Sequence, residues 1–425
     1  MGQVDKRDSE VKPWLRRRRY VHFDKVPSPA TIENVVFNPD DVARHAFFPF
    51  LGINNIVWKV SRISGKKLRR TGKMRPIRYA AHLDSAIYCY YNSILNSKYE
   101  EWLKIAGLDQ AVIAFRALGK SNIDFALDAF EWIEASQPCI AFGFDVKDFF
   151  GSLDHRQLKQ KWTELLEVSS LPPDHYAVYK SLTRYSFANL LDVREALGLS
   201  RTAASTLERL CSPSDFRTKI RAHGLVETNL GGNGIPQGSP LSATLSNIYM
   251  FEFDKRLHEF SLAHKAYYRR YCDDILIVVR PNDAAAAKVL IEAELAKLCL
   301  ELQSMKTTEC AFPFVPGSRS IQYLGLMYDG RKVYLRSSGI SRYYRKMRRG
   351  IIGMGSGKAG KLKLVRRRAE LLKRYTVHKF GSHQNFHSYV SRVDSKTGRR
   401  TAQQQMKNHV KKFNESVARQ LSKAS

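Results

Sequence analysis

Residues 267–279 read YYRRYCDDILIVV, two β-prone runs joined by a pair of adjacent acids. This pattern predicts a β-hairpin that presents Asp273 and Asp274 at its turn. Adjacent acids are common on protein surfaces and by themselves indicate little. A turn between apolar strands needs no second acid, however, and neighbouring carboxylates repel each other unless a cation lies between them. The hairpin is therefore a candidate site for divalent cations.

Two further stretches carry related signals. Residues 139–150, CIAFGFDVKDFF, predict a buried strand ending in Asp145, an acid that is either a helix cap or a metal ligand. Residues 231–241, GGNGIPQGSPL, are rich in glycine, which lets a backbone approach a ligand closely but is equally consistent with a simple turn. Ser239 is expected to cap a helix that has Pro240 at its first position. That helix should bury one face, formed by Leu245, Tyr249, Phe253 and Leu257.

The order of FDVKDFF, GIPQGSPLSATLSN and YCDD resembles the palm of reverse transcriptases, especially the bacterial group II intron and retron-like branch. The resemblance runs from Lys66 to Leu326, about three-fifths of the chain. Within that branch the chain is most similar to the stand-alone, defence-associated reverse transcriptases, which work against phage with a dedicated non-coding RNA. The resemblance implies an α+β right-hand polymerase, with fingers, a palm built on an antiparallel sheet, and a basic helical thumb.

The same resemblance implies a two-metal active site. Two Mg²⁺ ions about 3.5–4 Å apart, with Mn²⁺ as an alternative, would stabilise the attacking and leaving oxygens of nucleotidyl transfer. Asp145 and Asp273 would bridge the ions, and the Val146 carbonyl would complete one site. Asp274 would support the cluster more than bridge it. Asp145 and Asp273 are 128 residues apart, so they are expected to meet on adjacent palm strands.

Other positions match substrate-binding residues of the family. Lys73 and Arg75 resemble basic residues of the fingers that grip the incoming triphosphate, although an exposed basic strand would look the same. Phe150 matches the position whose ring excludes a ribose 2′-hydroxyl, and Gln237 would line the pocket of the nascent base pair. Lys306 matches a lysine beside the leaving pyrophosphate, either as a general acid or only as a charge partner.

Two more matches concern the nucleic-acid strands. Arg116 lies in a segment that resembles a template-tracking region, and residues 323–326 resemble the primer-grip turn. Cys272 stands where the family more often has Ala or Met, and it is small enough to be tolerated against the primer end.

Composition favours a polyanionic partner. Seventy Lys and Arg residues stand against forty Asp and Glu, a net charge of +30 with a pI near 9.9. Binding to phosphates releases counterions, so such an excess suits nucleic acid, with a ribosome-associated or peripheral membrane protein as the alternative. The six cysteines show neither a CxxC pair nor zinc-ligand spacing, and we expect free thiols.

The chain is expected to have three parts: a basic N-terminal extension over 1–60, fingers and palm over 61–335, and a basic helical thumb over 336–425. Residues 342–374 hold thirteen Lys or Arg and one acid, with a glycine-rich turn at 353–360 between two basic helices. The alternatives for this run are a solvated helical face or a disordered tail.

The functional prediction is an RNA-directed DNA polymerase that extends DNA on a dedicated, structured non-coding RNA in bacterial antiphage defence. Its expected partners are that RNA, the DNA product strand and deoxynucleoside triphosphates. The alternatives are an RNA-binding scaffold or maturase-like chaperone, and template-independent DNA synthesis by the same site. Residues 1–10 lack an apolar signal region and no apolar run approaches the roughly 20 residues of a membrane span, so we expect a cytoplasmic protein without a membrane partner.

Overall fold

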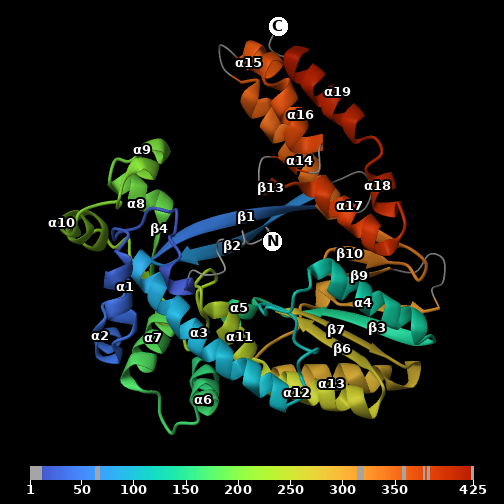
Figure 1. Cartoon of the computed structure of the whole chain (residues 1–425), viewed down its shortest axis with the longest axis horizontal. Helices are drawn as coiled ribbons and strands as arrows, with labels where there is room; N and C mark the ends of the chain where they lie inside the picture. Colours follow the sequence, from blue (N-terminus) through green and yellow to red (C-terminus); the bar gives the residue numbers. More distant parts are fainter. Residues whose placement is uncertain are drawn as a thin grey trace.

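The computed structural model describes residues 12–62, 68–313, 320–356, 360–376, 379–380 and 383–422. Residues 1–10, on which the expectation about a signal region rests, lie outside these ranges. Figure 1 shows the fingers elements on one side, the palm sheet below the C-terminal helices, and the long β1–β2 hairpin reaching from the fingers towards those helices. Helices and antiparallel sheets are thus combined as the sequence predicted.

The fingers are built on a four-stranded sheet in the order β2-β1-β4-β5. β1 pairs with β2 in an antiparallel hairpin, from Leu51 opposite Tyr79 to Arg62 opposite Leu68, and pairs with β4 in parallel. A division of the chain at residue 60 would therefore split this hairpin. The elements of the region are η2 Pro13–Leu15, α1 Pro29–Val36, α2 Pro39–Arg44, β1 Phe50–Arg62, β2 Leu68–Tyr79, α3 His82–Ile105, α6 His155–Leu166, α7 Pro173–Thr183, β4 Ser186–Asn189, α8 Leu190–Ala196, α9 Arg201–Thr206, α10 Pro213–Asp215, η3 Phe216–Arg221 and β5 Glu227–Thr228.

The palm is an antiparallel sheet in the order β6-β7-β3-β8. Its side chains alternate between two hydrophobic cores, as the two-residue period of a strand requires. Phe142 and Ile277 enter the core shared with α3 and α11, whereas Ala141 and Val278 enter the core shared with α4 and the C-terminal helices. The palm elements are α4 Asn122–Ala135, β3 Cys139–Asp145, α5 Phe149–Ser152, α11 Ser242–Tyr249, α12 Phe251–Ala263, β6 Tyr267–Tyr271, β7 Asp274–Val279, η4 Pro281–Asp283, α13 Ala284–Lys297, η5 Ser304–Lys306 and β8 Thr308–Phe312.

The expected helix after the glycine-rich loop exists, but Ser239 does not cap it. α11 begins at Ser242 with Leu241 at the N-cap position. The Ser239 hydroxyl instead accepts a hydrogen bond from the Leu241 N–H at 3.4 Å, and the Ser242 hydroxyl donates to the Pro236 carbonyl at 2.7 Å. The loop thus makes one more turn before the helix starts. The four residues predicted for the buried face are buried, although the helix is interrupted at Met250 between α11 and α12.

The C-terminal region packs against the palm through a small sheet in the order β11-β10-β9. α14 is amphipathic: Tyr343, Met347 and Ile351 join the second core, while its basic side chains are largely exposed. The glycine-rich turn joins α14 to α15, and residues 357–359 within it lie outside the described ranges. The elements are β9 Ile321–Tyr323, β10 Leu326–Tyr328, β11 Val333–Leu335, α14 Ser337–Met354, α15 Gly360–Arg366, α16 Arg368–Thr376, β12 Lys379–Phe380, β13 His383–Gln384, α17 Phe386–Thr397, α18 Thr401–Gln405 and α19 His409–Ser422.

Among the described helices, none is both long enough and apolar enough to cross a lipid bilayer.

Candidate active site

Backbone pairing gathers the three acids at one end of the palm sheet. β3 pairs antiparallel with β7, and the register sets Asp145 opposite Asp274. Asp273 lies in the β6–β7 turn beside Cys272, whose φ is +59°. The Asp273 carbonyl accepts a hydrogen bond from the Val146 N–H at 3.2 Å. The predicted hairpin and the predicted meeting of distant acids are both confirmed.

Negative charge is crowded at this point. Burial, together with the charges of Asp273 and Asp145, raises the pKa of Asp274 to about 6. Burial also raises the pKa of Asp273, with a further contribution from Asp145. The Nζ of Lys306 contacts a carboxylate oxygen of Asp145, and the Gln303 N–H donates to the Asp145 carbonyl at 2.7 Å. Like charges held close together favour the neutral acid, and a cation beside them would reverse that preference.

The glycine-rich loop packs tightly between β2 and α5, and at two of its positions only glycine fits. Gly234 has a φ of +89°, and a Cβ at this position would lie 2.9 Å from the Gly151 carbonyl oxygen. Gly238 has a φ of +124°, and a Cβ there would lie 2.5 Å from the Arg78 carbonyl oxygen. The Arg78 N–H also donates to the Gln237 carbonyl at 2.9 Å. The loop's close backbone approach therefore fixes the position of Gln237.

Phe150 lies on the α5 side of the same loop. Its carbonyl accepts a hydrogen bond from the Ile235 N–H at 2.9 Å, and its ring is half-buried against Phe149, with ring centroids 5.5 Å apart. The short helix α5 directly follows β3. The tertiary structure thus brings Phe150 against the glycine-rich loop that holds Gln237. Both residues lie close in the fold to β3, the strand that carries Asp145.

The three sequence motifs also fall within one family match. Residues 65–328 match the family described as reverse transcriptase (RNA-dependent DNA polymerase), more than half of the chain. The chain belongs to the reverse transcriptase family. The match includes the three acids, the glycine-rich loop and Lys306. A comparison with curated proteins found no match.

Solved telomerase structures resemble this family member at low identity. Apo telomerase from Candida tropicalis is 13% identical, with a TM-score of 0.40, and the alignment covers 88% of this chain and 66% of that one. Its form truncated from the C-terminal domain gives a TM-score of 0.42 at 13% identity, with 67% and 57% covered. Telomerase from Candida albicans in complex with a fragment of telomeric RNA gives 0.40 at 13% identity, with 79% and 54% covered. The chain thus spans 54 to 66% of the length of these structures.

The donor set of this reverse transcriptase family member suits a hard divalent cation. Asp145, Asp273 and Asp274 offer carboxylate oxygens, the ligands that Mg²⁺ prefers, and burial together with the charges of the first two raises the pKa of the third. Among the described residues no three acidic, histidine or cysteine side chains already converge as a metal cluster. The contact of Lys306 with Asp145 supplies the positive charge in this arrangement. The acids fit the ion chemically, and ion binding would require Asp145 to exchange its lysine partner.

The two basic residues predicted to grip a triphosphate lie on β2. Arg75 pairs with Asn55 of β1 and is exposed. Lys73 pairs with Val57 through its backbone, and its side chain lies outside the described part of the chain. β2 ends beside the loop that holds Gln237, where the Arg78 N–H donates to the Gln237 carbonyl.

The remaining family matches are Arg116 and the turn at residues 323–326. The Arg116 side chain is only 2% exposed and donates three hydrogen bonds to Glu100, at 2.9, 3.1 and 2.6 Å. It also donates to the backbone carbonyls of Asp109 and Val112. Its guanidinium therefore holds the loop after α3 in place. Residues 323–326 do form a turn, between β9 and β10.

Sequence reasoning missed a buried ion pair that supports the hairpin. Arg270 and Asp254 are both fully buried, and the guanidinium binds the carboxylate through Nε at 2.7 Å and Nη2 at 2.6 Å. Nη1 donates to the Cys272 carbonyl at 3.2 Å and to Asn247 at 3.1 Å. Tyr268 donates to the same carboxylate at 2.6 Å. The two-residue period of β6 places Tyr268 and Arg270 on one face, so an arginine at an inward position was the signal available.

Proposed function

We propose that this protein is an RNA-directed DNA polymerase that extends DNA by two-metal nucleotidyl transfer. The observation that carries the proposal is the meeting of Asp145, Asp273 and Asp274 at the end of the palm sheet. Adjacent acids with raised pKa values are costly to hold in a folded protein. Bound divalent cations would offset this cost, because their positive charge stabilises the ionised carboxylates.

Each residue of the site then has a proposed role. Asp145, Asp273 and the Val146 carbonyl would hold two Mg²⁺ ions, with Mn²⁺ as an alternative, and Asp274 would support them. When bound, such ions stabilise the charge on the attacking and leaving oxygens of an in-line displacement. Lys306, which contacts Asp145 in this structure, would on release meet the negative charge that develops on the pyrophosphate.

The substrates follow from the surroundings of the acids. Phe150 would exclude a ribose 2′-hydroxyl and so select deoxynucleotides, and Gln237 would contact the nascent base pair. Lys73 and Arg75 would bind the triphosphate from β2. Template and product would be RNA and DNA, and the basic helices α14 to α16 would hold their backbones through charge.

The direct test replaces both hairpin acids. Asp273→Ala with Asp274→Ala should abolish incorporation of labelled deoxynucleotide on a primed RNA template, since the ligands are lost while the strands remain. The matched control is Asp40→Ala with Asp41→Ala, an adjacent and exposed acid pair on α2, which should leave synthesis intact. RNA binding and circular dichroism of both variants should match the wild type. Substantial synthesis by the hairpin variant would refute the assignment.

The same assay separates the alternatives. Incorporation that persists without template would indicate template-independent synthesis by this site. Tight RNA binding with no incorporation under any primer, template or metal condition would indicate a scaffold or maturase-like chaperone.

A dedicated structured RNA and a role in bacterial antiphage defence are further parts of the proposal, and they rest on the sequence resemblance. Sequencing the RNA that co-purifies with the protein should return one predominant species. Cells that carry the wild-type chain with that RNA should form fewer phage plaques than cells carrying the Asp273→Ala, Asp274→Ala variant. A heterogeneous RNA pool and equal plaque counts would contradict this part.

A further inference from the structure

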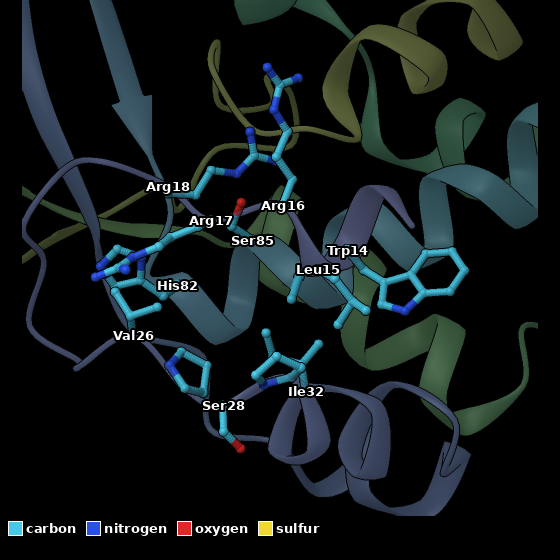
Figure 2. Close-up of a pocket in the computed structure, with 13 residues that line it drawn as sticks. Trp14, Leu15, Arg16, Arg17, Arg18, Val26, Ser28, Ile32, His82 and Ser85 are labelled. Carbon is cyan, nitrogen blue, oxygen red and sulfur yellow. The ribbon is translucent and has the colours of Figure 1, made fainter. Parts of the chain in front are cut away.

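A cavity of about 490 Å³ lies between the N-terminal segment and the start of α3. None of the residues that line it belongs to the acid cluster or the glycine-rich loop. Figure 2 shows Arg17 and His82 together on one side of the cavity and Trp14 on the other. The lining residues are Trp14, Leu15, Arg16, Arg17, Arg18, Val26, Pro27, Ser28, Pro29, Ile32, His82, Ser85 and Ala86.

The polar part of this cavity is strongly positive. It holds three consecutive arginines, Arg16 to Arg18, and no carboxylate is among the described residues that line it. Ser85 adds a hydroxyl group. The positive end of the 24-residue helix α3 lies at the same place, where the Leu83 N–H of its first turn donates to the Asp24 carboxylate at 3.1 Å. Arginine clusters and helix N-termini both favour anions, and phosphate above all.

His82 provides an independent sign of a missing ligand. It is only 5% exposed, and its ring stacks on that of Tyr20 with centroids 5.1 Å apart. Neither of its ring nitrogens has a hydrogen-bond partner among the described residues. Buried polar atoms are nearly always hydrogen-bonded, because an unsatisfied one costs about 1–3 kcal/mol. Burial lowers the pKa of His82, with Arg17 and Arg18 contributing in the same direction against Asp24, so one nitrogen is a neutral N–H donor.

The other part of the cavity is apolar. Trp14, Leu15 and Ile32 form a wall, and the Trp14 ring is fixed edge-to-face against Phe37 and Tyr90. A volume of about 490 Å³ is within the range of small-ligand sites, about 300–1,000 Å³. The cavity therefore combines a positively charged side with an apolar side that includes an aromatic ring.

We propose that this cavity is a second nucleotide site, which binds the terminal phosphate of a nucleotide through Arg16, Arg17, Arg18 and His82. A phosphate monoester carries close to two negative charges, more than the single charge of an internal phosphodiester, and so suits three guanidinium groups. The base lies against Trp14 and Ile32. The ligand is either a free nucleotide or the phosphorylated end of an RNA strand, and the site is independent of the polymerase reaction.

The test uses the full-length protein and one short RNA sequence in three forms: 5′-phosphorylated, 3′-phosphorylated and unphosphorylated. Fluorescence anisotropy at physiological salt should show that at least one phosphorylated form binds about tenfold or more tightly than the unphosphorylated one, the effect of one or two charge-assisted hydrogen bonds. Adenosine monophosphate and adenosine, used as competitors, distinguish the sources. If adenosine monophosphate competes and adenosine does not, the site binds a free nucleotide. If adenosine monophosphate does not compete while the protein still prefers the phosphorylated RNA, the site binds the end of a strand.

Three variants assign the preference to this cavity. His82→Phe keeps the ring stack but removes both nitrogens, and it should reduce the preference several-fold. Replacing the arginines 16–18 with alanine should remove the preference. Replacing residues 366–368 of the thumb with alanine removes the same charge from another part of the protein. This variant should bind all three RNAs more weakly, while the ratio of their affinities stays unchanged. The proposal is overturned by a wild-type preference below about threefold, or by a preference that survives both cavity changes.

Discussion

The buried pair of Arg270 and Asp254 should be the most sensitive polar contact in the palm. Both side chains are fully excluded from water. Burial by itself would lower the pKa of Arg270, but the charge and hydrogen bonds of Asp254 raise it above its usual value. The pair is therefore ionised, and removing one partner leaves the other as an uncompensated buried charge. In such cases the free energy of unfolding falls by about 3–5 kcal/mol.

Asp254→Asn tests this directly, since it keeps the shape of the side chain but removes the charge and replaces one acceptor oxygen with an amide donor. The expected loss, about 3–5 kcal/mol, is a large part of the 5–15 kcal/mol that stabilises a typical domain. The matched control is Glu100→Gln, which breaks the pair with Arg116. Glu100 is 36% exposed, and Arg116 would keep its two backbone carbonyl partners. That change should cost about 1 kcal/mol or less.

Urea unfolding followed by both circular dichroism and tryptophan fluorescence measures these differences, and coincident transitions justify the conversion to free energy. A double change, Asp254→Leu with Arg270→Met, should recover part of the loss because no charge remains buried. Recovery should be incomplete, since the Cys272 carbonyl and Asn247 lose their donor. If Asp254→Asn costs no more than Glu100→Gln, or if the double change is worse than the single one, the reasoning is wrong.

Three further predictions concern the proposed site and the thumb. Phe150→Ala should raise incorporation of rGTP relative to dGTP, because the ring no longer blocks the 2′-hydroxyl; an unchanged ratio would show that Phe150 is not the gate. Gly238→Ala should lower the free energy of unfolding by about 1–3 kcal/mol and reduce synthesis, since its Cβ would collide with the Arg78 carbonyl. Gly232→Ala is the control, because a Cβ at this position would meet no neighbouring atom within 4 Å, and it should change the free energy of unfolding by no more than about 0.5 kcal/mol. Similar losses of stability in the Gly238 and Gly232 variants would contradict the tight packing of the loop at Gly238. Replacing residues 366–368, all exposed, with alanine should flatten the slope of log affinity against log salt by up to about 2–3 units, at roughly 0.7–0.9 per lost phosphate contact. An unchanged slope would mean that these arginines only solvate the helices.

Much of the palm could be predicted from the sequence because its signals are local. The β-prone apolar runs in 139–145 and 267–279 predict strands, and the acids at their ends predict where charge gathers. The glycines of the loop predict close backbone approach, which the structure confirms at Gly234 and Gly238. The predicted start of the following helix was wrong by two residues because Ser239 bonds within its own turn, a local preference that competes with capping.

Other features depend on contacts between residues far apart in the sequence, and only the tertiary structure decided them. No local pattern pairs Arg270 with Asp254, or turns Arg116 inward to Glu100. The contact of Lys306 with Asp145 joins positions 161 residues apart.

The N-terminal cavity likewise depends on contacts between residues far apart in the sequence. The sequence shows a run of arginines followed by a turn-rich segment, which by composition is only a basic arm. Packing of that arm on α3 sets Arg17 beside the buried His82, whose ring nitrogens find no hydrogen-bond partner in the described part of the chain, and places Trp14 opposite. Sequence by itself determined the family, the strands and the acids, because period and motif are properties of neighbouring residues. Which charges are buried, paired or left facing a cavity depended on how distant segments pack, because desolvation and hydrogen bonding exist only once those segments meet.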